Sequence, residues 1–151
     1  MTAQGSLPET VTANDAETLA AIHSQVFPAS AAWDAATMTT LLGLAGVFGF
    51  RCGSEAFILV RHVLDEAEIL TLAVLPSSRR QGLGAVLVET AAATATALGA
   101  ERMFLEVAEA NEPARSLYRA MDFERIGLRR NYYSPGMHAE LLRRWLRRRP
   151  S

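Results

Sequence analysis

The apolar residues change their spacing along the chain, and these changes separate helical from extended segments. Residues 15–26 carry apolar side chains at helical spacing, and Asn14 stands where an N-cap is expected. A second helix is predicted to begin at Trp33-Asp34. Apolar, β-favouring runs with turn residues between them follow, and they predict an antiparallel meander. Its three strands are expected at 47–52, 56–64 and 68–75, after a short edge strand at 9–13.

The second half of the chain alternates helices with strands. The polar loop 77–81 leads into a long run of helix formers over 82–98, which Gly99 ends. A short apolar strand at 102–107 precedes a helix that Asn111 caps. A final hairpin is predicted from 123–133 and 137–146, joined by Ser134-Pro135-Gly136.

This order contains one strand–helix–strand crossover within an otherwise antiparallel arrangement, so it predicts a mixed-sheet α/β (α+β) fold. The length of 151 residues fits one domain over 1–151. Its ends, 1–8 and 147–151, are polar and are expected to be loose.

Composition and charge narrow the function classes. Half of the residues are apolar, 21% are charged and the net charge is −1, which is typical of a globular protein and argues against a nucleic-acid-coating one. No apolar run approaches ~20 residues, and the N-terminus lacks signal-peptide features, so we expect a cytoplasmic protein without a membrane span. A single cysteine, Cys52, excludes an intramolecular disulfide, and we expect no metal site.

The loop before the long helix has the features of a phosphate-binding loop. Gly82 and Gly84 allow close approach of the backbone to a ligand, and the helix start offers unpaired N–H groups. Two arginines, Arg79 and Arg80, add positive charge, so the expected ligand is a pyrophosphate. The chain contains no lysine, which excludes a Walker A loop, and Leu87 replaces the third small residue of a dinucleotide fingerprint. A glycine-rich turn with solvated arginines is the alternative.

The pattern Arg79-x-x-Gly82-x-Gly84 after a strand resembles the acetyl-CoA loop of the GNAT N-acetyltransferases. The stretch 64–133 is similar to the ribosomal-protein-alanine N-acetyltransferases (RimI type) within that superfamily. The blocks that carry this likeness are LDEAEILTLAV, RRQGLG, LEVAEAN, LYRAMDF and RRNYY. The resemblance implies a GNAT-type sheet that is mostly antiparallel, with a bulge in the strand before the loop and a splayed parallel strand pair. It further implies acetyl-CoA as co-substrate and, as acceptor, the N-terminal alanine of a small-subunit ribosomal protein.

The resemblance also implies which residues hold the cofactor. The backbone of Leu72, Ala73 and Val74 would meet the acetyl carbonyl and the pantetheine arm. Asn111 would contact the same arm, in addition to capping its helix. The pyrophosphate would lie on the loop residues and the first helical turn, namely Arg79, Arg80, Gln81, Gly82, Leu83, Gly84 and Ala85.

Two residues are candidates for the chemistry. Glu106 stands in an otherwise apolar strand, and burial of a carboxylate raises its pKa, which suits a general base near neutral pH. The matching glutamate of RimI-type enzymes removes the acceptor's proton; a strand-end glutamate paired with an arginine is the alternative. Tyr118 matches the tyrosine of the family's Leu-Tyr dipeptide, which would protonate the departing thiolate; its alternative role is core packing.

Departures from the family pattern leave the acceptor open. They are the insertion 29–32, Asp122 where the family has glycine, and His138-Ala139-Glu140 in place of an acidic pair. Other protein N-termini or a small amine are therefore alternative acceptors, and a non-catalytic acyl-CoA sensor is the alternative from another class. The arginines of 143–149 are expected to form a solvated terminal run, with RNA contact as the weaker alternative.

Overall fold

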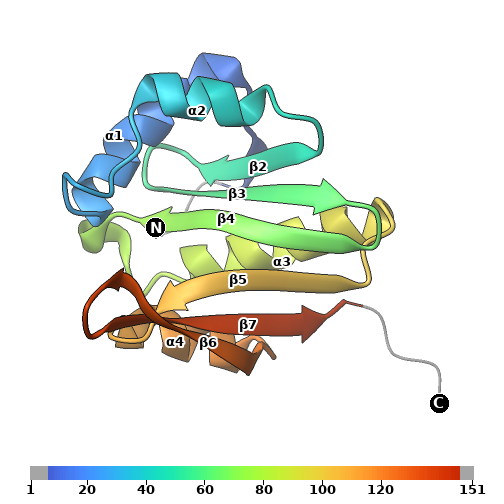
Figure 1. Cartoon of the computed structure of the whole chain (residues 1–151). Helices are drawn as coiled ribbons and strands as arrows, with labels where there is room; N and C mark the ends of the chain where they lie inside the picture. The colour runs from blue at the N-terminus through green and yellow to red at the C-terminus, as the bar shows by residue number, and fades with distance from the viewer. Residues whose placement is uncertain (1–6, 147–151) are drawn as a thin grey trace.

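The computed structural model describes residues 7–146, which form a seven-stranded mixed sheet in the order β1-β2-β3-β4-β5-β7-β6 (Figure 1). All neighbouring strands pair antiparallel except β4 and β5, which are parallel. The predicted mixed sheet, the meander and the final hairpin are thereby confirmed. The strands are β1 (Glu9–Thr10), β2 (Val47–Cys52), β3 (Ala56–Val63), β4 (Glu66–Val74), β5 (Arg102–Ala108), β6 (Glu124–Ser134) and β7 (Met137–Trp145).

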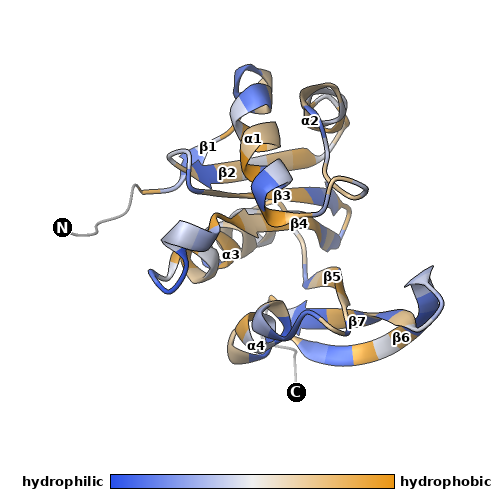
Figure 2. Ribbon diagram, turned by 90° about the vertical axis from the view of Figure 1, so that its left-hand side faces the viewer, coloured by the Kyte–Doolittle hydropathy of each residue, from blue (hydrophilic) through white to orange (hydrophobic). Residues whose placement is uncertain are grey.

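The helices lie on both faces of the sheet (Figure 2). One apolar cluster joins α3 and α4 to one face, and a second joins α1 and α2 to the other. None of the helices within residues 7–146 has the length and apolar character needed to cross a membrane. The four α-helices of the described residues are α1 (Ala16–Val26), α2 (Ala35–Leu42), α3 (Leu83–Ala97) and α4 (Glu112–Ala120), with short 3-10 turns η1 (Ala13–Asp15) and η2 (Pro76–Ser78).

The start of the first helical segment differs from the prediction that Asn14 caps it. The cap is Thr12, whose side chain accepts from the Asn14 N–H at 3.2 Å, while the Asp15 carboxylate accepts from the Thr12 N–H at 2.8 Å. This reciprocal capping box satisfies two donors at once, so the chain turns into η1 two residues earlier than a cap at Asn14 would allow.

A bulge in β4 divides the core between the two faces. Leu59 of β3 pairs with Thr71 and Val60 pairs with Ile69, so Leu70 is the extra residue. Before the bulge, Ile69 packs in the α3 cluster; beyond it, Ala73 packs in the α1–α2 cluster. One inserted residue therefore reverses which side chains of β4 face each layer.

His23 of α1 is buried in the second cluster and ties α1 to both the α1–α2 connection and β4. The Trp33 N–H donates to its Nδ1 at 3.0 Å, so the proton of the neutral ring lies on Nε2, which donates to Thr71 Oγ1 at 3.2 Å. Its ring stacks on Phe27 and Trp33, with centroids 4.2 and 4.8 Å away. Burial lowers the pKa of His23 to about 4, because the charged imidazolium would lose its hydration.

This histidine makes stability depend on pH. In the unfolded chain an imidazole takes up its proton near pH 6.5, whereas folded His23 does so only near pH 4, so acid favours the unfolded state across this interval. As the pH decreases through that interval, we expect the free energy of unfolding to fall by about 1.4 kcal/mol per pH unit from this group alone. Urea unfolding followed between pH 4.5 and 7 measures the slope. In His23→Gln the slope should be smaller by that amount; an unchanged slope would contradict the assignment.

Candidate functional site

β4 and β5 run side by side only at their beginnings. Their parallel pairing covers Glu66 to Glu68 against Arg102 to Phe104, although β4 continues to Val74 and β5 to Ala108. Beyond the last pair the strands part, as the widening space between them shows (Figure 1). The backbone of β4 after Glu68 consequently has no β5 partner. Both the expected bulge and the expected splayed pair are present.

The candidate cofactor-binding residues of β4 lie along the stretch that pairs with β3 but not with β5. Leu72 and Val74 face α3, and Ala73 faces α1 and α2. A Cβ added to Gly84 would lie 3.1 Å from Leu117 Cδ2 and 3.8 Å from Val74 Cγ2. Glycine at position 84 thus lets the start of α3 pack closely against β4 and α4, a role in packing that the sequence had not indicated.

The predicted phosphate loop forms an open helix start. Gly82 is the N-cap of α3 in the left-handed conformation (φ 77°), and Arg80 is left-handed too (φ 68°). No side chain within residues 7–146 caps the helix, and its first N–H groups have no intrahelical partner either. The side chains of Arg79, Arg80 and Gln81 are exposed, and Arg79 Nε donates to the Val74 carbonyl at 3.3 Å. Leu83, the first residue of α3, is buried. This arrangement is suited to an anionic group.

α4 supplies the remaining candidates on the α3 side of the sheet. The Asn111 side chain accepts from the Ala114 N–H at 3.2 Å, which confirms the predicted cap. Tyr118 is buried in the α3–α4 cluster, edge-on to Phe123 with ring centroids 5.4 Å apart. Burial raises the pKa of Tyr118 well above its usual value, so its phenol is protonated throughout the neutral range.

Glu106 lies on the other face of the sheet. Its neighbours Leu105 and Val107 face the α3–α4 cluster, so by strand alternation Glu106 projects away from it. Arg129 of β6 approaches it, with Nε 3.6 Å from Glu106 Oε2. That oxygen is buried and accepts no hydrogen bond from any residue within 7–146. The structure therefore places Glu106 on one face of the sheet, two residues beyond the last β4–β5 pair, and Tyr118 in the cluster that covers the other face.

Further polar residues gather around Glu106 that sequence reasoning had not singled out. Partial burial and the Glu106 carboxylate raise the pKa of Glu68, while Arg129 lowers it. Partial burial and Glu106 likewise raise the pKa of Tyr133. The guanidinium of Arg129 lies 5.3 Å from the ring centroid of Tyr132. The RRNYY block contains Arg129 and the two tyrosines, and the LDEAEILTLAV block contains Glu68, but neither block by itself indicates that these side chains meet around Glu106.

The tip of the β6–β7 hairpin is held by its own polar groups. Asn131 is left-handed (φ 54°), and its N–H donates to His138 Nδ1 at 2.9 Å. Its side-chain oxygen accepts from the Gly136 N–H at 2.7 Å. These two bonds fix the loop that carries Tyr132 and Tyr133 where the strand ladder is interrupted.

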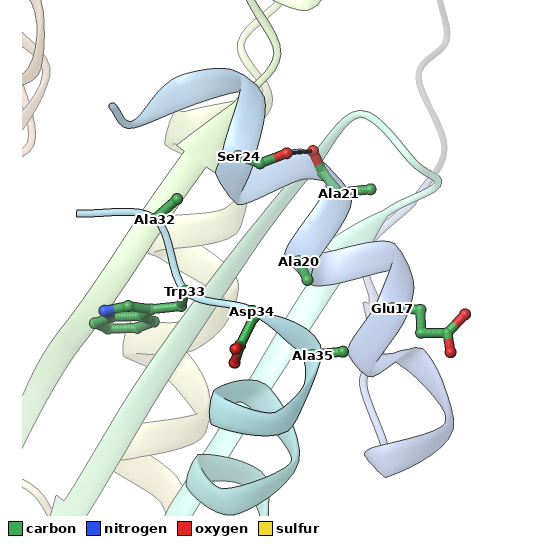
Figure 3. Close-up of a pocket in the computed structure, with 8 residues that line it drawn as sticks. All are labelled: Glu17, Ala20, Ala21, Ser24, Ala32, Trp33, Asp34 and Ala35. Carbon is green, nitrogen blue, oxygen red and sulfur yellow. Dashed lines mark hydrogen bonds between the residues drawn. The ribbon is translucent and has the colours of Figure 1, made fainter. Parts of the chain in front are cut away.

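A pocket of about 400 Å³ lies elsewhere, between α1 and the start of α2 (Figure 3). Trp33 and Asp34 line it together with small residues of α1 such as Ala20. None of the predicted site residues lines this pocket, and the Asp34 carboxylate that borders it already caps α2 through the Thr37 N–H. The pocket is therefore separate from the candidate site.

The arginines near the end of β7 are structural rather than solvated, which corrects the prediction for the described part of 143–149. Arg143 donates to the Glu124 carboxylate at 2.8 Å, and Arg144 makes two bonds of 3.1 Å to Glu89 of α3. Residues 147–149 lie outside the described residues.

Known proteins show the same fold and share part of the sequence. A family model described as "Acetyltransferase (GNAT) family" matches residues 9–123. The ribosomal protein bS18-alanine N-acetyltransferase of Escherichia coli K12 is 40% identical over 78 residues, which are 52% of this chain and 53% of that protein. The chain thus matches about half the length of this curated relative. An uncharacterized protein of Mycobacterium leprae is 35% identical over 89% of this chain and 39% of its own length.

Solved structures extend the likeness to almost the whole fold. The crystal structure of the ribosomal-protein-S18-alanine N-acetyltransferase from E. coli has a TM-score of 0.83 and 26% identity, covering 95% of this chain and 96% of that one. Ard1 from Thermoplasma volcanium, at 21% identity and a TM-score of 0.80, covers 94% and 99% and shares the fold. The family model, which covers residues 9–123, establishes the family. The chain belongs to the acetyltransferase (GNAT) family.

Proposed function

We propose that the protein transfers the acetyl group of acetyl-CoA to the α-amine of a protein N-terminus. The observation that supports this proposal is that Glu106 follows the last β4–β5 pair on one face of the sheet, while Tyr118 is buried in the cluster on the other face. A thioester lying between the strands would have a base on one side and an acid on the other. This is the arrangement that direct attack by an amine requires.

The roles of Glu106 and Tyr118 follow from the proton that each side chain can accept or donate. The acceptor amine, arriving largely protonated, loses a proton through water to Glu106, and its nitrogen then attacks the thioester carbon. As the C–N bond forms and the C–S bond breaks, the thiolate of coenzyme A takes a proton from Tyr118, and the nitrogen loses its second proton, which restores the Tyr118 phenol through water. The raised pKa of Tyr118 ensures that this proton is present at neutral pH. Each group contributes roughly 10²–10⁴ in rate.

The cofactor would lie against the α3 side of the opening. The N–H groups of the loop from Arg80 to Ala85 face the pyrophosphate, and Arg79 and Arg80 supply exposed positive charge. The backbone of Leu72, Ala73 and Val74, which lacks a β5 partner, receives the acetyl carbonyl and the pantetheine arm. Asn111 contacts the same arm.

The acceptor would approach from the Glu106 side. Its best candidate is the N-terminal alanine of small-subunit ribosomal protein bS18, because the E. coli relative and structural neighbour act on that protein. The ring of Tyr133 and the hairpin tip border the same face and are exposed to a peptide. Transfer to other N-termini uses the same chemistry.

The two roles predict separable losses of turnover. Tyr118→Phe and Glu106→Gln should each lower kcat at least tenfold, because each removes one proton-transfer group, and leave the affinity for acetyl-CoA nearly unchanged. Steady-state kinetics and calorimetric binding measure the two quantities. Glu124→Gln is the matched control, since it removes an exposed carboxylate of β6 and should keep turnover. Near-wild-type turnover in both site variants would refute the assignment.

The loop proposal is tested by a pair of glycines at the two ends of α3. Gly82 (φ 77°) and Gly99 (φ 106°) are both left-handed, and an added Cβ at either position would meet no atom of residues 7–146 within 4 Å. Alanine at either should therefore cost about 1–2 kcal/mol of stability through backbone strain alone. Only Gly82→Ala should also weaken acetyl-CoA binding, by about tenfold, because it disturbs the proposed pyrophosphate loop. Equal affinities of the two variants in calorimetry would place the cofactor elsewhere.

Intact-mass spectrometry tests the acceptor. The protein and acetyl-CoA are incubated with unacetylated small-subunit ribosomal proteins, with lysine-blocked copies as control. We expect one acetyl group on a single protein that begins with alanine, in blocked copies as well. Modification of many N-termini would retain the chemistry and broaden the substrate. The absence of any transfer, with cofactor bound, would refute N-terminal acetylation and favour a small-amine acceptor or a sensor.

A further inference from the structure

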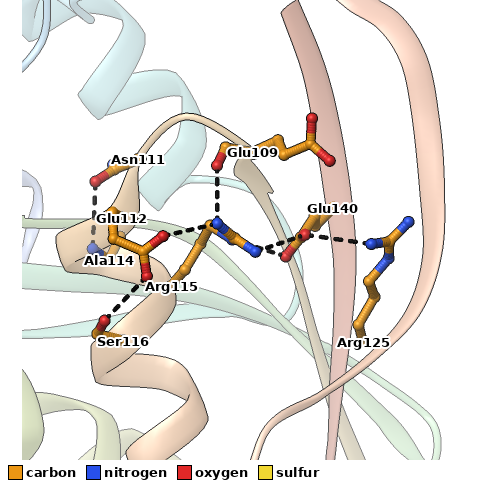
Figure 4. A network of polar contacts seen from close by, with 8 residues as sticks. All are labelled: Glu109, Asn111, Glu112, Ala114, Arg115, Ser116, Arg125 and Glu140. Carbon is orange, nitrogen blue, oxygen red and sulfur yellow. Dashed lines mark hydrogen bonds and ion pairs between the residues drawn. The ribbon is translucent and has the colours of Figure 1, made fainter.

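A polar network joins α4 to the sheet at the end that faces the site (Figure 4). The Arg115 guanidinium donates to both carboxylate oxygens of Glu140 on β7, at 3.1 Å from Nε and 3.0 Å from Nη2. Its Nη1 donates to the Glu109 carbonyl at 3.2 Å and to the Glu112 carboxylate at 2.9 Å. One side chain thus binds β7, the turn that precedes Asn111 and the first turn of α4.

The burial of this network distinguishes it from the surface ion pairs. Glu140 is 3% exposed, and its second cationic neighbour, Arg125 of β6, has Nη1 3.6 Å from Oε2. A bidentate arginine–carboxylate pair is directional, and inside a protein it fixes geometry more than it adds stability. Removing one partner would leave the other charge buried without compensation.

Apolar packing alone does not set the exact position of α4. Of its nine residues, Tyr118 is buried and Ala114 and Leu117 are partly buried against the same cluster. Contacts of this kind are not directional, so they fix how far a short helix slides or turns on the sheet less closely than a bidentate ion pair does. Arg115 precedes Tyr118 by about one helical turn, so its bonds to Glu140 set the place from which the Tyr118 side chain extends.

We infer that Arg115 and Glu140 are a positioning pair that holds Tyr118 at the thioester. The inference rests on the proposed function and adds to it two residues that touch neither substrate nor cofactor. In the sequence, His138-Ala139-Glu140 replaces an acidic pair that is common in the family, so the family pattern gives Glu140 no role. In the structure, Glu140 binds Arg115 of α4.

The test is a double-mutant cycle with Tyr118. Glu140→Gln keeps the shape of the side chain and removes its charge. Arg115→Lys keeps the positive charge and removes the planar guanidinium that donates two hydrogen bonds to the carboxylate. Each should lower kcat about tenfold and change the calorimetric Kd for acetyl-CoA less than threefold. In the Tyr118→Phe background the same changes should lower kcat less than twofold further, because the group they position is already absent. Circular dichroism and thermal unfolding establish that each variant is folded at the assay temperature.

Glu89→Gln is the matched control. Glu89 also forms a two-bond pair with an arginine of β7, Arg144, but it joins α3 to the sheet and is 57% exposed, so its variant should keep kcat within twofold of wild type.

The outcomes separate this inference from the function on which it rests. A full tenfold loss from Glu140→Gln in the Tyr118→Phe background would show that the pair acts on the site or fold in general, and it would overturn the inference alone. Wild-type turnover of both Glu140→Gln and Arg115→Lys would overturn it as well. Wild-type turnover of Tyr118→Phe by itself would remove the acid role from the proposed function, and the positioning role with it.

Discussion

The arrangement of the site depends on one constraint on the backbone, namely that β4 pairs with β5 for only three residues before the two strands part. The extra residue at Leu70 belongs to the same constraint, because it rotates the following part of β4 relative to its beginning. If the ladder continued to Val74, the backbone groups of β4 would be used within the sheet. Because it does not, the sheet keeps an opening with a different helical layer on each face.

Much of this fold could be predicted from the spacing of apolar residues. Strand alternation and helix periodicity are local, so the elements and even the cap at Asn111 were found within a few residues. The cap at Asn14 was wrong for a local reason too, since the Thr12 side chain accepts from the Asn14 N–H and the Asp15 carboxylate completes the capping box at the Thr12 N–H. A bulge at Leu70 is different: its position depends on which residues of β3 it faces, and that register is not written in β4 alone.

The parts of the site that are contiguous in sequence could be predicted, and those assembled from distant segments could not. The loop around Gly82 is contiguous in sequence, so its motif was recognisable, whereas the packing role of Gly84 depends on Leu117, which comes from another helix. The surroundings of Glu106 come from β4 and β6, and no local pattern could assemble them. Arg143 and Arg144 resemble a solvated charge run in sequence, yet their partners Glu124 and Glu89 lie 19 and 55 residues away.

The ion pairs of this protein have a chemical property that follows from their composition. Every one of them among residues 7–146 uses an arginine as the cation, and the whole sequence contains no lysine. Acetyl thioesters slowly modify lysine side chains without any catalyst, and each such event removes a positive charge. A guanidinium is always protonated and offers no free amine lone pair to acylate. The charges that hold α3 and α4 to the sheet are therefore inert toward the reagent that this protein is proposed to bind, even during long exposure to it.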